Sequence, residues 1–179
     1  MRSWIPIPGT TTGRLVVASL ELFGAHGFTA VAVGTISARA GVTTGSLYHH
    51  FGSKTGLYQL VRTDVEQRVL DRLEGAASMR RVQTLSDLTP VLLVGFDYLI
   101  SSGYTRLLGE AFPETGDGTQ TPDEIERFVG RSLGTGGAPV AALAAAAWRA
   151  ALWLASDGPE AALDAREALA LLLAGGSPA

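Results

Sequence analysis

The feature that most constrains the fold of this chain is the segment of residues 35–51, TISARAGVTTGSLYHHF. Apolar residues spaced four apart mark one face of each of two short helices, as Leu47 and Phe51 do in the second. Between the helices, Gly41 suits the left-handed position that ends a helix. Two short helices joined by such a turn form a helix-turn-helix, whose second helix lies in the major groove of DNA.

Small polar residues open the second predicted helix. Thr43, Thr44, Gly45 and Ser46 are short enough to approach base edges. Thr and Ser discriminate bases poorly compared with Arg or Asn, and residues 43–51 contain no Arg or Lys. We therefore expect sequence readout to depend on Thr and Ser contacts, on bridging water and on DNA shape.

Together with its flanks, this segment resembles the TetR family of one-component transcriptional regulators. The resemblance rests on Arg14 followed by LVVASLELFGAHGF, then on VGTISARAGV, TGSLYHHF and GSKTGLY, and it ends near Tyr58. Three positions depart from the family pattern. Ala32 stands where a capping Ser or Thr is common, Gly34 where a longer polar or basic residue is common, and Thr55 where Glu often follows the Lys.

The resemblance implies a homodimeric repressor that binds a pseudo-palindromic, double-stranded DNA operator and is released by a small molecule. It also implies that Tyr48 and His49 face the DNA while His50 packs or hydrogen-bonds inside. Lys54, at the start of the next predicted helix, suits a backbone phosphate. The expected DNA-binding residues are Thr35, Thr43, Thr44, Gly45, Ser46, Tyr48, His49 and Lys54.

The net charge of −3 is unevenly distributed along the 179 residues. Residues 1–60 carry four basic residues and one acidic residue, whereas residues 61–179 carry ten basic and sixteen acidic ones. An acidic protein can therefore still present a basic end to a polyanion. The absence of cysteine excludes a disulfide framework and Cys-based metal or redox sites. The first residues contain no apolar run of signal-peptide length, so we expect a cytoplasmic protein.

The metalloprotease motif HExxH is missing from the sequence, and no paired set of catalytic residues appears. His49 and His50 are adjacent, so on a helix they point about 100° apart and cannot share one metal ion. We expect no enzymatic activity, no metal site and no cofactor. The alternative function is an interaction protein on the same fold with weak or lost DNA binding, which is suggested by Ala32, Gly34 and the acidic C-terminal part.

Apolar periodicity and capping residues predict an all-α chain of about nine helices. The predicted helices span residues 13–25, 33–40, 44–50, 53–77, 90–103, 104–112, 122–133, 139–156 and 159–174. Thr89 before Pro90, and Thr121 three residues before Glu124, are the signals for the starts at 90 and 122. The predicted domains are a flexible arm at 1–12, a three-helix DNA-binding domain with the helix-turn-helix at 13–52, and a helical effector-binding and dimerisation domain at 53–179.

The segment VAALAAAAWRAALWLAS at residues 140–156 is apolar nearly all round. A membrane span is disfavoured because the segment is short, rich in Ala and interrupted by Arg149. Burial by its own domain on one side and by a second subunit on another explains it better, in a four-helix interface with two-fold symmetry. The expected interface residues are Leu143, Ala147, Ala151, Leu163, Leu169 and Leu172.

The resemblance also implies a pocket for a small, mostly apolar effector in the C-terminal domain. Its expected lining residues are Phe96, Leu99, Tyr104, Leu108, Phe112, Phe128 and Trp148. Aromatic residues at helical spacing are equally typical of a plain hydrophobic core, so composition alone leaves both interpretations open.

Overall fold

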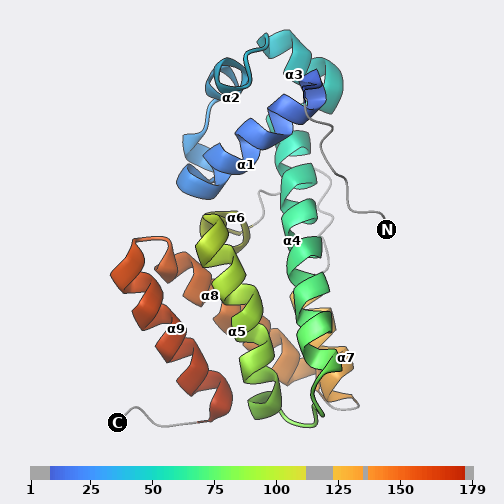
Figure 1. Cartoon of the computed structure of the whole chain (residues 1–179), viewed down its shortest axis with the longest axis vertical. Helices are drawn as coiled ribbons and strands as arrows, with labels where there is room; N and C mark the ends of the chain where they lie inside the picture. Colours follow the sequence, from blue (N-terminus) through green and yellow to red (C-terminus); the bar gives the residue numbers. More distant parts are fainter. Residues whose placement is uncertain (1–8, 112–122, 135–136, 176–179) are drawn as a thin grey trace.

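The computed structural model describes residues 9–111, 123–134 and 137–175, and the regular structure of these residues is entirely helical. Nine helices follow one another in this part of the chain (Figure 1). They are α1 (Thr11–Ala30), α2 (Val33–Ala40), α3 (Thr44–Phe51), α4 (Lys54–Ser78), α5 (Leu85–Ser102), α6 (Thr105–Gly109), α7 (Glu124–Leu133), α8 (Ala138–Ala155) and α9 (Pro159–Ala174). This confirms the predicted all-α fold.

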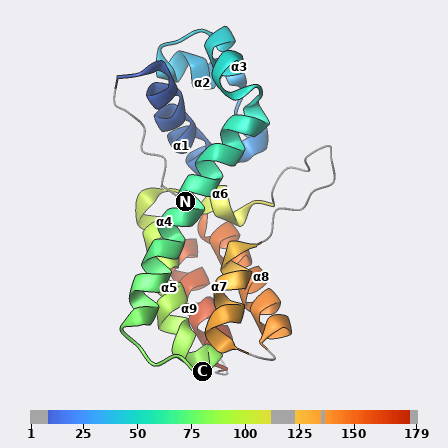
Figure 2. The same cartoon turned by 90° about the vertical axis from the view of Figure 1, so that its right-hand side faces the viewer.

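The helices gather into two groups joined by α4. In Figures 1 and 2, α1, α2 and α3 lie at one end of the molecule, and α5 to α9 lie at the other. α4 packs against α1 and α3 at the first end and against α5 and α7 at the second. Because α4 belongs to both groups, the domain boundary between residues 52 and 53 stays a prediction.

Hydroxyl side chains set the starts of three of the first four helices. Thr10, Thr43 and Ser53 each accept a hydrogen bond from a backbone N–H in the first turn of the helix that follows. α2 starts after Ala32 without such a bond. Gly41 ends α2 at φ 64°, and its N–H donates to carbonyls of the last turn, as the helix-turn-helix pattern predicts.

A kink near the end of α1 replaces the predicted helix end. α1 continues to Ala30, but Gly27 has φ 76° and ψ 175°, far from helical values. These dihedrals suit glycine because a positive φ is strained for residues with a side chain. The predicted helix end at residue 25 therefore lies two residues before this break, and the chain resumes helical structure after it.

Three helices of the C-terminal group differ from the prediction. α5 begins after Thr84, which forms a capping box with Asp87, so Pro90 lies inside the helix instead of starting it. α6 is shorter than the predicted 104–112. α7 is capped by Asp123, whose carboxylate accepts two backbone N–H groups. The predicted cap Thr121 lies outside the described residues, as do residues 1–8 of the predicted arm and residues 113–120.

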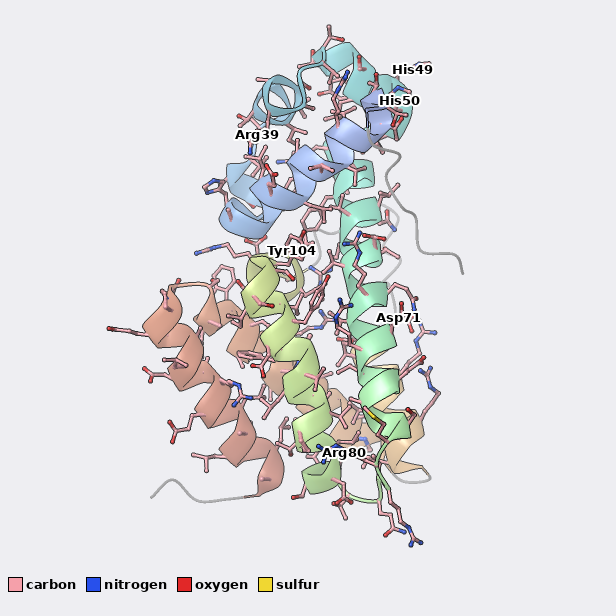
Figure 3. All side chains as sticks on the ribbon, in the orientation of Figure 1. Arg39, His49, His50, Asp71, Arg80 and Tyr104 are labelled. Carbon is pink, nitrogen blue, oxygen red and sulfur yellow. The ribbon has the colours of Figure 1, made fainter. Side chains whose placement is uncertain are left out.

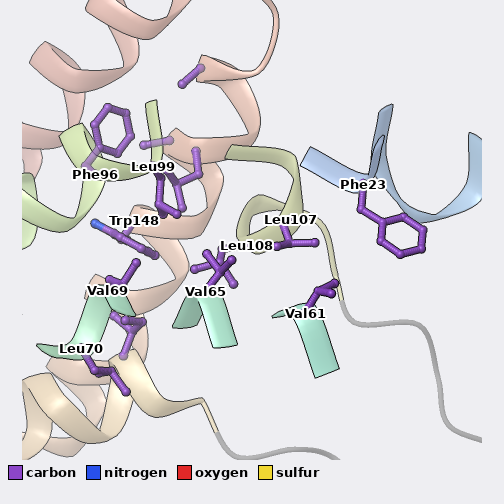
Figure 4. Close-up of a cluster of buried hydrophobic side chains, with 14 of the residues drawn as sticks. Phe23, Val61, Val65, Val69, Leu70, Phe96, Leu99, Leu107, Leu108 and Trp148 are labelled. Carbon is purple, nitrogen blue, oxygen red and sulfur yellow. The ribbon is translucent and has the colours of Figure 1, made fainter. Parts of the chain in front are cut away.

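One continuous hydrophobic core runs through both groups of helices. An apolar stripe of α4 with residues four positions apart is fully buried and consists of Leu57, Val61, Val65, Val69 and Leu73. Figure 4 shows Val65 and Val69 of this stripe beside Phe96 and Trp148 from the other helices. The Trp148 indole N–H donates to the Leu92 carbonyl at 3.0 Å, which satisfies the one polar atom of that buried ring.

α8 is the one described helix that is long and apolar enough to cross a membrane by length and composition alone. It packs against α5, α6, α7 and α9, and its Arg149 makes ion pairs inside the protein. Core helices of folded domains pass the same test of length and composition. The contacts of α8 therefore fit a core helix that leaves one apolar side exposed.

Candidate nucleic-acid interface

The second helix of the helix-turn-helix is anchored by a single leucine. Leu47 of α3 is fully buried, and Phe51, one turn later, is half-buried. The N–H of Val42 in the turn donates to the Ser37 carbonyl at 3.0 Å and fixes the angle between α2 and α3. The inner face of α3 thus holds the helix in place and leaves the other side free for a partner.

The outer side of α3 exposes the predicted polar residues. Thr44, Gly45, Tyr48 and His49 are exposed, and 53% of Tyr48 is accessible to solvent. Thr43 is exposed as well, but its hydroxyl caps α3 and lies 3.0 Å from that of Ser46. Thr35 is exposed on α2. Their role in DNA binding stays a prediction.

His50 differs from the expectation that it packs inside. It is exposed, and its ring lies with the centroid 5.1 Å from that of His49 (Figure 3). Leu47 and Phe51 already occupy the inner side of this short helix, and His50, the residue before Phe51, points outward. Among the described residues, no cluster of three His, Asp or Glu side chains could hold a metal ion.

Lys54 points inward, which the sequence did not indicate. Its ammonium group donates to the carbonyls of Phe28 at 2.9 Å and Val31 at 3.0 Å, and it lies 4.1 Å from the centre of the Phe28 ring. An ammonium group has three protons, so two of its three donors are already used. The expected phosphate contact must therefore compete with an internal one. These carbonyls lie more than twenty residues away, which is why no local signal could reveal them.

Two arginines near the helix-turn-helix lie on α1 and α2. Arg39 forms an exposed ion pair with Glu21 at 2.7 Å, and Arg14 is exposed on the first turn of α1. Both border a groove of about 430 Å³. The groove is lined by Gly9, Gly13, Arg14, Val17, Ala18, Glu21, Arg39 and Ala40, none of which belongs to α3.

A family model for bacterial regulatory proteins of the tetR family matches residues 15–61, which hold the whole helix-turn-helix. Residues 15–61 therefore carry the sequence pattern of the tetR family. The match agrees with the resemblance stated from the sequence and covers the same residues to within a few positions.

Three solved structures share the fold over nearly their whole length. A protein of the tetR family of transcription regulators from Shewanella sp. PV-4 has a TM-score of 0.63 at 20% identity, covering 93% of this chain and 97% of that one. A gamma-butyrolactone receptor, an ArpA-like protein, has 0.56 at 18%, covering 92% and 94%. NalD, the secondary repressor of the MexAB-OprM multidrug efflux pump in Pseudomonas aeruginosa, has 0.55 at 19%, covering 93% and 94%. No curated protein matched the chain.

In this TetR-type fold, most of the predicted effector residues lie in the core. Phe96, Leu99, Leu108 and Trp148 are fully buried and belong to one apolar cluster, as Figure 4 shows, and Phe128 is buried on α7. Tyr104 is half-buried and lies toward α1 (Figure 3), where burial raises the pKa of its hydroxyl. Phe112 lies outside the described residues. A pocket among these side chains stays a prediction.

A polar network holds four helices together beside this cluster. Arg149 of α8 donates to Asp123 at the start of α7 at 2.6 Å and to Glu66 of α4 at 3.0 Å. It also donates to the Leu108 carbonyl of α6 at 3.0 Å. Burial acts to raise the pKa of Asp123, but the hydrogen bonds and charge of Arg149 and the N–H groups of α7 lower it overall. Arg149 is therefore an internal structural residue of α8.

The predicted dimer residues divide into an outer and an inner set. Leu143, Leu163 and Leu172 are exposed, by 73%, 69% and 64%, and Ala147 is half-buried. Ala151 and Leu169 are instead buried against the protomer's own helices and cannot present their side chains to a partner. The structure adds Val140, Trp153 and Leu154 to the exposed apolar residues. Leu154 was foreseeable, since it follows Leu143 by about three helical turns.

Proposed function

We propose that this chain is a transcriptional regulator, most simply a cytoplasmic repressor, that binds a pseudo-palindromic DNA operator as a homodimer. The observation that carries the proposal is the exposed side of α3, where Thr44, Tyr48 and His49 face outward while Leu47 is buried. A helix that enters the major groove needs an anchored inner face and small or hydrogen-bonding residues on its outer face. α3 has both.

The proposed homodimer is supported by the exposed leucines of α8 and α9. Exposed apolar side chains gathered on one surface are typical of a protein interface. Leu143, Leu163 and Leu172 lie on two helices that pack against each other, so a second copy could cover them with the same two helices. Two-fold symmetry of the protein would then match the symmetry of the operator.

We also propose a small, mostly apolar effector that binds between α4 and α8, near Phe96 and Trp148. Two structures with the same fold are named as a gamma-butyrolactone receptor and as an efflux-pump repressor, and these names support ligand response and repression for this chain as proposals. A ligand that favours a dimer in which the two α3 helices are wrongly spaced for the operator weakens DNA binding. Because the two binding equilibria are linked, DNA weakens ligand binding by the same factor.

The test is to select duplexes from a random-sequence library with the purified protein and to measure their affinity at several salt concentrations. We expect an enriched motif with two-fold symmetry and an affinity that falls linearly with salt on logarithmic axes. Thr44→Asp places a negative charge on the outer side of α3 and should reduce affinity roughly tenfold or more. The matched control is Thr63→Asp on an exposed position of α4, which should leave affinity unchanged.

The second candidate function is an interaction protein on the same fold with weak or lost DNA binding. It is favoured by the internal bonds of Lys54, by the absence of Arg and Lys from α3, and by the pairing of Arg39 with Glu21. These observations lower the number of cations that are free to meet phosphates. A dimer that binds no duplex of the library, even at low salt, would establish this alternative over the repressor.

A further inference from the structure

Near its end, α1 packs against the second group of helices at two glycines, Gly24 and Gly27, which have no side chain. A Cβ atom at Gly24 would lie 2.4 Å from the Gly103 carbonyl oxygen, and one at Gly27 would lie 1.8 Å from a carboxylate oxygen of Glu110. At Gly24 the close atom belongs to the backbone, so a side chain there would disturb this docking. At Gly27 the close atom is the end of the flexible Glu110 side chain, which a Cβ would push away, and the positive φ of 76° also favours glycine. α1 therefore sits directly on the α5–α6 turn and on the end of α6.

Glu110, the residue after α6, reaches across this boundary. Its carboxylate accepts the backbone N–H of Phe28 at 2.9 Å, although the two residues are far apart in sequence. The kink at Gly27 interrupts the helical dihedrals just before this N–H. A charged acceptor for a backbone donor makes one of the stronger hydrogen bonds in proteins.

The position of Glu110 is in turn fixed by α4. Arg62, which is almost fully buried, donates to the carbonyls of Leu107 and Glu110, both at 2.8 Å. The last carbonyls of a helix lack partners within the helix, so a cation there stabilises the helix end. Arg62 thus holds the end of α6 where the Glu110 side chain can reach α1.

Phe28 is held from its other side by the start of α4. Lys54 donates to the Phe28 carbonyl at 2.9 Å, so the N–H and the C=O of this one residue are bound by opposite charges. Lys54 follows the last residue of α3, Phe51, by three positions. One polar path from the end of α6 to the start of α4, just after α3, therefore passes through Phe28.

α6 also packs closely on α8. A Cβ atom at Gly109 would lie 2.8 Å from the backbone nitrogen of Trp153, so the two helices cross with little between them. Gly109 and Glu110 are neighbours, and they contact α8 and the end of α1 respectively. One short helix consequently joins the exposed apolar helix α8 to the helix-turn-helix group.

We propose that Glu110 is a positioning residue that sets the orientation of the DNA-binding group of helices on the C-terminal group, and that α6 connects α8 to α1 in parallel with α4. Removal of the Glu110 carboxylate leaves the Phe28 N–H without this acceptor, and α4 then remains as the main connection between the two groups of helices. α3 then samples a wider range of orientations. Only the effect of this change on DNA affinity rests on the proposed function.

The orientation can be measured by electron-electron spin resonance between two labels. The chain has no cysteine, so Ala38→Cys on α2 and Ser86→Cys on α5, both exposed, can be labelled specifically. Labelled protein is mixed with an excess of unlabelled protein, so that a dimer rarely contains two labelled subunits and the measured distance lies within one subunit. The variants to compare are Glu110→Ala, Glu110→Gln, which keeps an acceptor oxygen, and Glu110→Asp, which keeps the charge but shortens the reach.

The matched control is Glu74→Ala, because Glu74 joins α4 to α7 by an exposed ion pair with Arg131 and does not reach the DNA-binding group. We expect a narrow distance distribution for the wild type, Glu110→Gln and Glu74→Ala, and a broad or shifted one for Glu110→Ala and Glu110→Asp. Hydrogen exchange at the Phe28 amide should be roughly tenfold faster in these last two variants. Unchanged distances and unchanged exchange in Glu110→Ala, with the fold intact by circular dichroism, would overturn the proposal.

Two further outcomes separate this proposal from the proposed function. If Glu110→Ala does not fold, Glu110→Asp decides in its place, and wild-type behaviour of that variant would count against a positioning role. Operator affinity should fall several-fold in Glu110→Ala and recover in Glu110→Gln, because ordering a mobile group costs binding free energy. Broadened distances in a protein whose wild type binds no DNA would support the positioning role and refute the repressor.

Discussion

α3 and the pair α8–α9 both expose one side to solvent, but they expose different chemistry. The outer side of α3 presents two hydroxyls and an imidazole at Thr44, Tyr48 and His49, whereas α8 and α9 present leucines such as Leu143 and Leu163. Hydroxyl and imidazole groups remain well solvated until a polar partner arrives, whereas exposed leucines are stabilised only by an apolar partner. The two ends of the molecule are therefore suited to different partners and can be disturbed separately.

The largest expected effect is a difference in stability between substitutions on the inner and the outer side of α9. Leu169→Asp places a charge in the protomer core and should lower the free energy of unfolding by about 4 kcal/mol or more. Leu163→Asp on the exposed side should change protomer stability by no more than about 0.5 kcal/mol and should convert a dimer into monomers.

Denaturant unfolding at two protein concentrations and light scattering distinguish the two variants, since dimer dissociation makes apparent stability depend on concentration. Equal loss of stability in both would show that the outer leucines belong to the protomer core. A wild-type protein that is monomeric at micromolar concentration would leave the exposed side of α8 and α9 without its proposed partner.

The next effect tests whether α8 is held by its own protomer. Arg149→Met leaves Asp123 and Glu66 without their shared cation and should lower the free energy of unfolding by about 3 kcal/mol. Folding lowers the pKa of Asp123, so the ionised carboxylate stabilises the folded protein. This stabilisation is fully present above the ordinary pKa of about 4 and is lost as the pH falls from there through the lowered pKa of the folded state. Urea unfolding between neutral and acid pH should show this loss in the wild type and less of it in Arg149→Met.

A surface pair provides the control for that prediction. Arg166→Met removes the exposed ion pair with Asp97 and should lower stability by no more than about 1 kcal/mol. If the two substitutions have similar effects, α8 owes its position to apolar contacts and the network around Arg149 adds little.

A substitution of Lys54 tests whether this residue stabilises the fold or contacts DNA. Lys54→Met keeps an apolar stem over Phe28 but removes two hydrogen bonds to carbonyls, so it should lower stability by about 1.5–3 kcal/mol. The slope of DNA affinity against salt concentration should stay as in the wild type. A slope that falls by about one phosphate contact would instead return Lys54 to the role expected from the sequence.

The smallest effect concerns the outer side of α3. Tyr48→Phe removes one exposed hydroxyl and should weaken DNA binding by about 1 kcal/mol while stability is unchanged. Fluorescence anisotropy with the selected duplex measures the change. Tyr98→Phe on α5 is the matched control and should leave the affinity as it is, so a loss in both variants would point to an indirect effect.

The sequence was most informative where a local signal decides the structure. α2 and α9 have the predicted bounds of 33–40 and 159–174, because Gly41 ends the first and Pro159 starts the second. α5 was mispredicted because Thr89 and Pro90 look like a helix start, whereas the capping box of Thr84 and Asp87 comes earlier and the helix tolerates the proline.

The candidate site shows the same limit. The outward residues of α3 follow from the four-residue spacing of Leu47 and Phe51, since that spacing alone fixes the inner face. The inward position of Lys54 and the burial of Leu169 depend on which helices pack nearby, and no residue adjacent to them in the sequence carries that information. Contacts between distant segments were therefore the part that only the structure could supply.

The two glycines of α1 bear on how such a chain can vary. Where Gly24 and Gly27 dock, main-chain atoms of α1 lie against a carbonyl group and a carboxylate, and the rings of Phe23 and Tyr58 pack beside them in the core. Substitutions at the exposed positions of α1 can accumulate without moving one group of helices relative to the other, provided that positions 24 and 27 stay free of a side chain. In a library that varies every residue of α1, selection for function should return many solutions at exposed positions such as Ala25 and His26, and glycine alone at 24 and 27.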